Sequence, residues 1–79
     1  MNIEIHLYAT LARHLPPEAR DKSRTLSLPQ GAAVRDAIKA LDIPDASVKL
    51  IFVNGIHGKR DTVLSDGDRL GLFPPVGGG

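Results

Sequence analysis

One helical stripe set among short strand-like segments limits what this 79-residue chain can fold into. The stripe consists of Val34, Ala37, Ile38 and Leu41, which recur at the spacing of one face of a helix. Pro44 marks the point by which this helix has ended. The other apolar residues come in short runs typical of strands, and a helix on one face of a small mixed sheet can bury all of them together. The sequence therefore predicts an α+β domain.

Four segments have the residue pattern of strands. Residues 3–7 alternate apolar with more polar side chains, which predicts a strand with one buried face. Residues 25–28 alternate in the same way and predict a second strand, paired with the first as a wide hairpin. Leu50–Val53 is a continuous apolar run, so we expect a central strand that is covered on both faces. The last strand is expected over residues 70–73.

Short irregular segments are expected between these strands. Residues 10–15 predict a short helical turn or a loop that two prolines end, and residues 18–24 predict an exposed connection. Asn54 and Gly55 form a turn pair that adopts positive φ at little cost. Residues 56–59 are therefore expected to return as a brief strand.

Composition excludes several classes of function. Ten basic and nine acidic residues give a net charge of +1, which provides no electrostatic attraction for nucleic acid or an anionic membrane. The chain has no cysteine, and its three histidines are widely spaced, so we expect no metal or cofactor site. No apolar run is long enough to span a bilayer, and the N-terminal residues lack a signal-peptide pattern. We expect a cytosolic protein with a body over residues 1–74 and a flexible tail over residues 75–79.

The last seven residues form the most distinctive motif. They are Phe73, Pro74, Pro75, Val76, Gly77, Gly78 and Gly79. Proline fixes φ and donates no backbone hydrogen bond, so the proline pair is expected to stop the last strand and lead the chain off the body. Glycine has no side chain, so the tail can lie extended in a slot too narrow for other residues. Its extended reach from Pro75 is roughly 17 Å, enough to enter the active site of a partner.

With this tail, four segments resemble the small sulfur carriers of the ubiquitin-like β-grasp superfamily. They read IHLYATLAR at residues 5–13, VRDAI at 34–38, FVNG at 52–55 and LSDGDRLGLFPPVGGG at 64–79. The resemblance is strongest to the small subunit of molybdopterin synthase, and the thiamine-pathway sulfur carrier is a near relative. At position 77 that family more often has another small residue, and at position 72 an aromatic residue.

The resemblance implies a β-grasp fold and a carrier function centred on Gly79. An E1-like adenylating enzyme would activate the Gly79 carboxylate with ATP and magnesium, and a sulfur donor would then displace AMP to leave a thiocarboxylate. A large synthase subunit, or another sulfur-accepting synthase, would receive the sulfur. On this interpretation the chain binds no cofactor and has no catalytic machinery of its own.

The resemblance also implies which residues meet the partner. Phe73 corresponds to a phenylalanine that packs into the partner beside the tail, although from the residues alone it could equally belong to the core. Pro74, Pro75 and Val76 are expected to contact the partner as well. Gly77 and Gly78 form the tail proper, and glycine at positions 78 and 79 leaves space around the Gly79 carbonyl for attack on it.

Alternatives to this function stay open. Within the same chemistry, the carrier could serve thiamine or another sulfur-containing metabolite. In a different class, a ubiquitin-like modifier would be joined through Gly79 to lysines of other proteins. A β-grasp interaction module with an inert tail is the third possibility.

Overall fold

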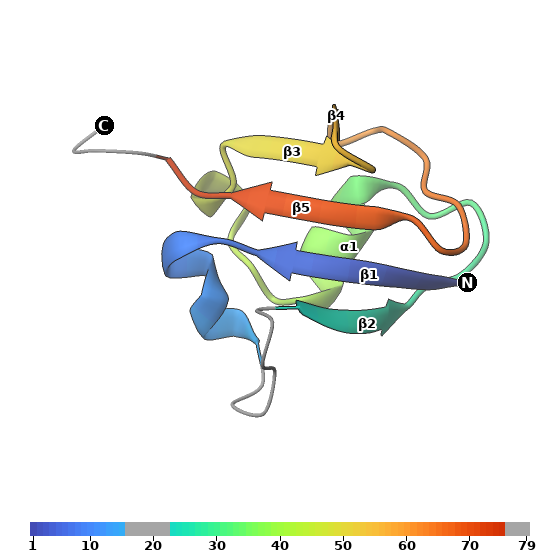
Figure 1. Ribbon diagram of the computed structural model, residues 1–79, viewed down its shortest axis with the longest axis horizontal. Helices are drawn as coiled ribbons and strands as arrows, with labels where there is room; N and C mark the ends of the chain where they lie inside the picture. Colours follow the sequence, from blue (N-terminus) through green and yellow to red (C-terminus); the bar gives the residue numbers. More distant parts are fainter. Residues whose placement is uncertain (16–22, 76–79) are drawn as a thin grey trace.

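The computed structural model describes residues 1–15 and 23–75 and shows a sheet with one α-helix on one of its faces (Figure 1). The elements in chain order, with η denoting a 3-10 helix, are β1 (Asn2–Leu7), η1 (Ala9–His14), β2 (Ser23–Ser27), α1 (Val34–Ala40), η2 (Asp45–Ser47), β3 (Leu50–Val53), β4 (Ile56–His57) and β5 (Arg69–Phe73). No helix in these described residues is long and apolar enough to cross a membrane.

The last strand of the chain lies at the centre of the sheet. The strand order is β2-β1-β5-β3-β4, so β5 has β1 on one side and β3 on the other. The pairing of β1 with β5 is parallel, and the other three pairings are antiparallel. The sheet is therefore mixed, and a single helix covers it, which is the β-grasp arrangement. The predicted α+β class and β-grasp fold are confirmed.

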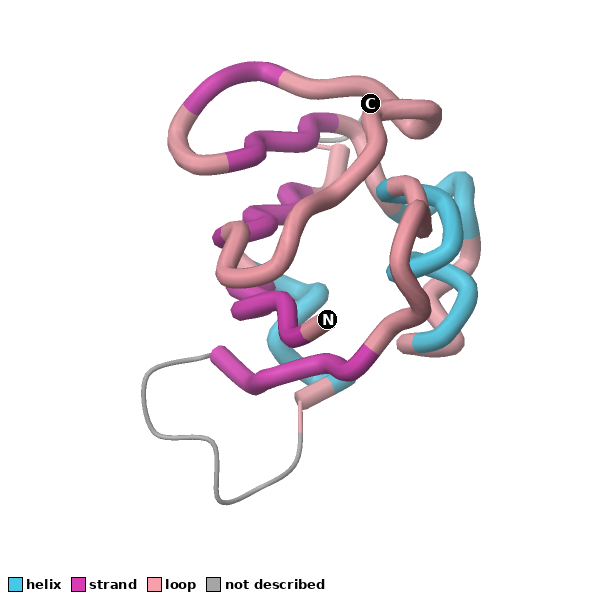
Figure 2. The backbone as a smooth tube through the Cα atoms, turned by 90° about the vertical axis from the view of Figure 1, so that its right-hand side faces the viewer, coloured by secondary structure: helices cyan, strands magenta, loops and turns pink. Residues whose placement is uncertain are grey.

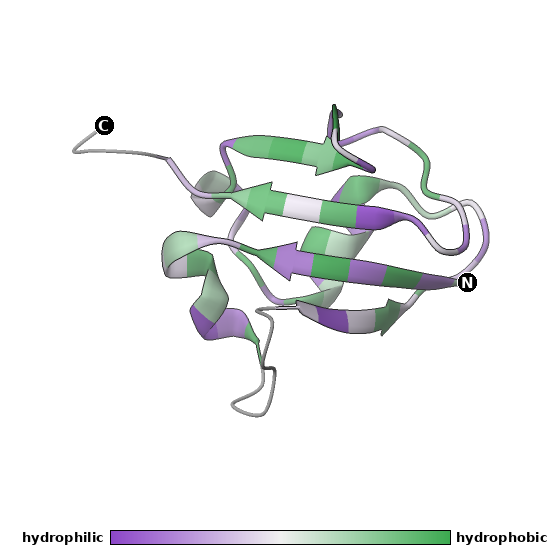
Figure 3. Cartoon of the chain, viewed as in Figure 1, coloured by the Kyte–Doolittle hydropathy of each residue, from purple (hydrophilic) through white to green (hydrophobic). Residues whose placement is uncertain are grey.

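The core lies between the sheet and α1. In a view turned by 90° from that of Figure 1, the strands form one layer and α1 lies opposite them (Figure 2). The predicted helical stripe is buried, and so are the alternate residues of β1 and β5 that face it. This alternation is visible as green and paler or purple bands along both strands (Figure 3). The N–H of Ala33 donates to the Asp36 carboxylate at 2.8 Å, which satisfies one of the unpaired donors where α1 begins.

Two sequence-based boundaries were inaccurate. The expected turn over residues 10–15 is present as η1. However, β2 begins at Ser23, so the exposed connection expected over residues 18–24 extends too far into the strand, and the rest of it lies outside the described residues. The strand expected over residues 56–59 consists of only two residues, β4.

The prediction that β3 is a central strand covered on both faces is wrong. The strand lies next to the edge of the sheet, and only Ile51 of its four residues is buried. Leu50 is exposed, and Phe52 and Val53 are half-buried. The physical reason is that α1 covers only one face, so the apolar residues that point the other way stay on the surface.

Candidate functional site

The central strand holds the chain firmly up to the residue where the tail begins. The N–H of Tyr8 donates to the carbonyl of Leu72 at 3.2 Å, and the N–H of Lys49 donates to the carbonyl of Phe73 at 2.8 Å. After Phe73 the sequence has two prolines, which cannot continue the hydrogen-bond ladder. The start of the tail is therefore fixed by strands on both sides.

Pro74 is buried and Pro75 is exposed. The chain therefore comes to the surface at Pro75, the residue at which the tail was expected to begin. The remaining tail residues, Val76, Gly77, Gly78 and Gly79, lie outside the described residues. Their roles, and partner contact by the two prolines, stay predictions.

Phe73 lies on the outer face of the sheet, away from α1. Its ring stacks on the ring of Tyr8, with centroids 4.2 Å apart and planes 3° from parallel. It also meets the ring of Phe52 edge-on, with centroids 5.6 Å apart. Phe73 ends β5, Tyr8 directly follows β1 and Phe52 lies within β3. We call these three residues the aromatic cluster. The sequence left open whether Phe73 belongs to the core, and the structure places it in this half-exposed cluster instead.

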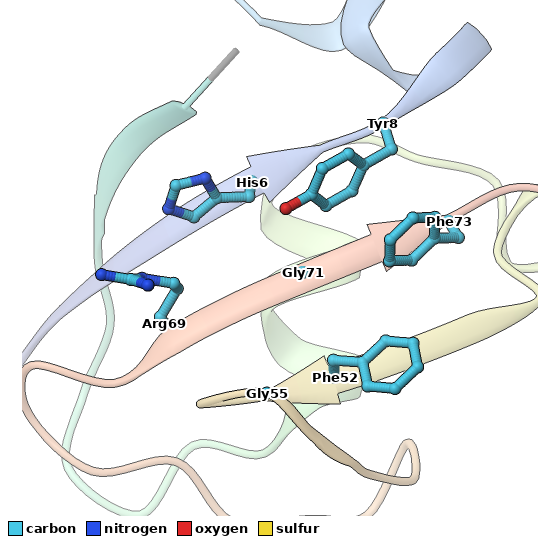
Figure 4. Close-up of a pocket in the computed structure, with 7 residues that line it drawn as sticks. All are labelled: His6, Tyr8, Phe52, Gly55, Arg69, Gly71 and Phe73. Atoms are coloured by element: carbon cyan, nitrogen blue, oxygen red, sulfur yellow. The ribbon is translucent and has the colours of Figure 1, made fainter. Parts of the chain in front are cut away.

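A shallow hollow adjoins the aromatic cluster (Figure 4). Its volume is about 340 Å³, and it is lined by His6, Tyr8, Phe52, Gly55, Arg69, Gly71 and Phe73. Small-molecule sites measure roughly 300–1,000 Å³. This hollow is at the small end of that range, so it has room for one large side chain. In the close-up the aromatic rings stand at one end, the side chains of His6 and Arg69 stand at the other, and Gly71 lies between them.

A small ion-pair network borders the charged end of the hollow. One oxygen of the Glu4 carboxylate lies 2.6 Å from Nε2 of His6 and accepts a hydrogen bond from Nε of Arg69 at 2.9 Å. The hydrogen bond with His6, and then the one with Arg69, lower the pKa of Glu4 below its usual value. Glu4 is well exposed, so water screens these interactions strongly.

The outer face of the sheet is suited to binding a protein. Aromatic side chains offer large contact areas with little loss of conformational entropy, and arginine offers a fork of hydrogen-bond donors. Across residues 1–15 and 23–75, no three His, Cys, Asp or Glu side chains come together as a possible metal site. The aromatic cluster and Arg69 share this face, and the tail begins at its edge.

Sequence reasoning missed most of this face. It left open which of Ile51, Val53, Leu70 and Leu72 point outward. The structure buries Ile51, Leu70 and Leu72 in the core and packs Val53, half-buried, against it. Tyr8 is the residue that could have been found, because it is in phase with Glu4 and His6, the outward positions of β1.

Comparison with protein families gives a match over nearly the whole chain. The model of the Mut7-C ubiquitin family matches residues 1–77. The chain belongs to the Mut7-C ubiquitin family. This places it among ubiquitin-like β-grasp proteins related to sulfur carriers and modifiers. No curated protein sequence matches the chain.

Solved structures agree with this membership. A protein described as molybdopterin converting factor subunit 1 from Pyrococcus furiosus is 28% identical, with a TM-score of 0.70 over 95% of this chain and 98% of that one. Small archaeal modifier protein 1 from Haloferax volcanii is 25% identical, with a TM-score of 0.74 over 95% and 98% of the two chains. The complex of subunits 1 and 2 of molybdopterin-converting factor from Helicobacter pylori contains a chain that is 21% identical, with a TM-score of 0.62 over the full length of both chains. At that identity the last similarity supports the fold alone.

Proposed function

We propose that this member of the Mut7-C ubiquitin family is a sulfur carrier that is charged and discharged at the carboxyl group of Gly79. The observation that carries the proposal is the aromatic cluster, whose member Phe73 ends the central strand shortly before the glycine segment, Gly77 to Gly79. Such a surface lets a partner bind the folded body while the glycine segment enters the active site of that partner. The reach of that segment, roughly 17 Å from Pro75, suits this arrangement.

The proposed chemistry takes place on the terminal carboxyl group. A free carboxylate is a poor electrophile, so an E1-like enzyme with ATP and magnesium first joins it to AMP and releases pyrophosphate. A persulfide sulfur of the donor then attacks the carbonyl carbon and displaces AMP. A thiol reduces the resulting acyl disulfide, which leaves a thiocarboxylate on Gly79 and a disulfide on the donor. Glycines at positions 78 and 79 keep both faces of the carbonyl accessible.

The sulfur acceptor that we propose is the large subunit of molybdopterin synthase. Support comes from the Pyrococcus furiosus protein, which is 28% identical and is described as subunit 1 of a molybdopterin converting factor. That description, subunit 1, implies a second subunit of the same factor. The proposal locates this exchange in the cytosol, where ATP and thiols are available.

A ubiquitin-like modifier is the second candidate. The similarity to small archaeal modifier protein 1, at 25% identity, favours it. Both functions begin with adenylation of Gly79, and they differ in the nucleophile that follows. A sulfur nucleophile gives a thiocarboxylate, whereas a lysine amine of another protein gives an isopeptide bond.

Reconstitution with purified components separates the two. The full chain is incubated with the adenylating enzyme of the same organism, ATP, magnesium, a persulfide donor and a reducing thiol, and its intact mass is measured. The carrier function predicts an ATP-dependent gain equal to the difference between sulfur and oxygen. Addition of cell extract should produce no high-mass adducts if the carrier function is correct. Adducts without sulfur loading would support the modifier, and an unchanged mass would contradict both.

A further inference from the structure

Gly71 occupies a position where the fold itself does not require glycine. It lies in the middle of β5, bonded into the sheet on both sides. Its φ lies outside the left-handed region that favours glycine. A Cβ at this position would lie 3.4 Å from Cε2 of Tyr8 and 3.9 Å from the carbonyl oxygen of Phe52, both ordinary contacts. Alanine would therefore fit, and it would remove the entropic penalty that glycine brings to a strand.

Glycine within a strand often marks a place where another group approaches the backbone closely. Here the cross-strand neighbours of Gly71 are His6 on β1 and Phe52 on β3. Side chains on these three strands would normally meet above β5. Because Gly71 has no side chain, it forms the floor of the hollow between His6 and the aromatic cluster, and the edge of the Tyr8 ring covers part of it (Figure 4).

The rim of the hollow offers unused hydrogen-bond donors to an anionic group. Arg69 donates to Glu4 through Nε, and its two terminal nitrogens make no hydrogen bond within residues 1–15 and 23–75. Among residues 1–15 and 23–75 no carboxylate lines the hollow, and Glu4 at its border is paired with His6 and with Nε of Arg69. The terminal nitrogens of Arg69 are therefore the groups that can bind a carboxylate brought by a partner.

We propose that the hollow over Gly71 is a specificity pocket for the enzyme that adenylates the tail. The pocket receives one apolar side chain of that enzyme, and a neighbouring carboxylate of the enzyme binds the terminal nitrogens of Arg69. An enzyme that holds the glycine segment must lie near Phe73, where β5 ends, and Phe73 also lines the pocket. Adenylation precedes both sulfur transfer and protein modification, so this partner is common to both candidate functions. The inference rests on the proposed function.

Steady-state kinetics of adenylation test the pocket. The full chain is the varied substrate of the purified adenylating enzyme, and ATP-dependent release of pyrophosphate is followed. Gly71→Val fills the pocket, and its control Ser27→Val adds the same side chain to the outer face of the edge strand β2. Arg69→Gln removes the guanidinium, and its control Lys39→Gln removes one positive charge from α1. Gly71→Ala, which the structure accommodates, still tests the pocket if the valine variant misfolds. Thermal unfolding is measured for all five variants.

The pocket predicts an increase in KM of about tenfold or more for Gly71→Val and Arg69→Gln. Gly71→Ala should raise KM less, and kcat should stay near that of the unsubstituted chain, because the tail is unchanged. The two control variants should keep the original KM. If the unsubstituted chain is adenylated and the Gly71 and Arg69 variants keep its KM, the proposed role of the pocket is refuted. The carrier function is not affected by that result. If the unsubstituted chain is not adenylated at all, the proposed function fails and the pocket fails with it.

Discussion

Replacement of Phe73 by alanine separates the two roles that an aromatic residue at the end of β5 can have. In the structure its ring has one stacked contact with Tyr8 and one edge-on contact with Phe52. Each such pair contributes roughly 0.5–1.5 kcal/mol beyond area burial. Phe73 is half-buried and lies outside the buried core, so the two pairs dominate and we expect the free energy of unfolding to fall by about 1–3 kcal/mol.

Leu72→Ala is the matched control from the neighbouring position. Leu72 is fully buried on the helix-facing side of the same strand, and truncation of such a residue removes roughly 2–5 kcal/mol. Urea unfolding of both variants, followed by circular dichroism, measures the difference. A double-mutant cycle with Tyr8→Ala should give a coupling energy of roughly 0.5–1.5 kcal/mol for the stacked pair.

The effect of Phe73→Ala on partner binding should be larger than its effect on folding. A buried aromatic anchor at an interface contributes about 2 kcal/mol or more, which corresponds to a rise in KM of roughly thirtyfold for the adenylating enzyme. If Phe73→Ala destabilises the fold as much as Leu72→Ala, Phe73 acts as a core residue. If its KM stays unchanged, the aromatic cluster does not contact this enzyme, and the reasoning is refuted.

Three further predictions concern the tail, the ion-pair network and a loop anchor. Gly79→Ala should sharply slow adenylation without shifting the unfolding midpoint, and an undiminished rate would contradict the role of Gly79. The fold lowers the pKa of Glu4, so its contribution to stability is present above its usual pKa of 4.5 and is lost as the pH falls through the lowered value. The difference in free energy of unfolding between the original chain and Glu4→Gln should therefore disappear in acid. A difference that persists in acid would refute this. Arg60 donates to the Asp45 carboxylate at 2.6 Å and to the carbonyls of Asp45 and Val48 at 2.9 and 2.7 Å. Arg60→Met should therefore lower the free energy of unfolding by about 1–3 kcal/mol in urea titrations, more than Asp45→Asn, whose side chain is largely exposed; equal losses would contradict the importance of the two carbonyls.

The helix and the strands with one buried face could be predicted from the sequence because their periodicity is set by one layer of contacts. The α1 stripe and the alternation in β1 each report which side faces the core, and both predictions are confirmed. The continuous apolar run of β3 carried no such information. Its outward residue Phe52 belongs to the aromatic cluster, so an apolar side chain on the surface looked like one in the core.

The candidate site could be predicted only in part, for a related reason. Phe73 and the glycine segment are adjacent in the sequence, and their pattern is readable there. The cluster also needs Tyr8, which is brought beside Phe73 by the parallel pairing of the first and last strands. Local periodicity does not determine that pairing. Gly71 could not be singled out either, because its significance depends on the space above it and on the neighbours that the sheet register places there.

The mass of the C-terminal peptide, taken from the protein isolated from its own cells, tests the carrier function most directly. Proteolysis under conditions that preserve acyl thioacids, followed by high-resolution mass spectrometry, identifies both the last residue and the atom on its carbonyl carbon. We predict a peptide that ends at Gly79, with a fraction in which one carboxyl oxygen is replaced by sulfur. A peptide that continues past Gly79 in the mature protein, or one that never carries sulfur even while the pathway is active, would contradict the account.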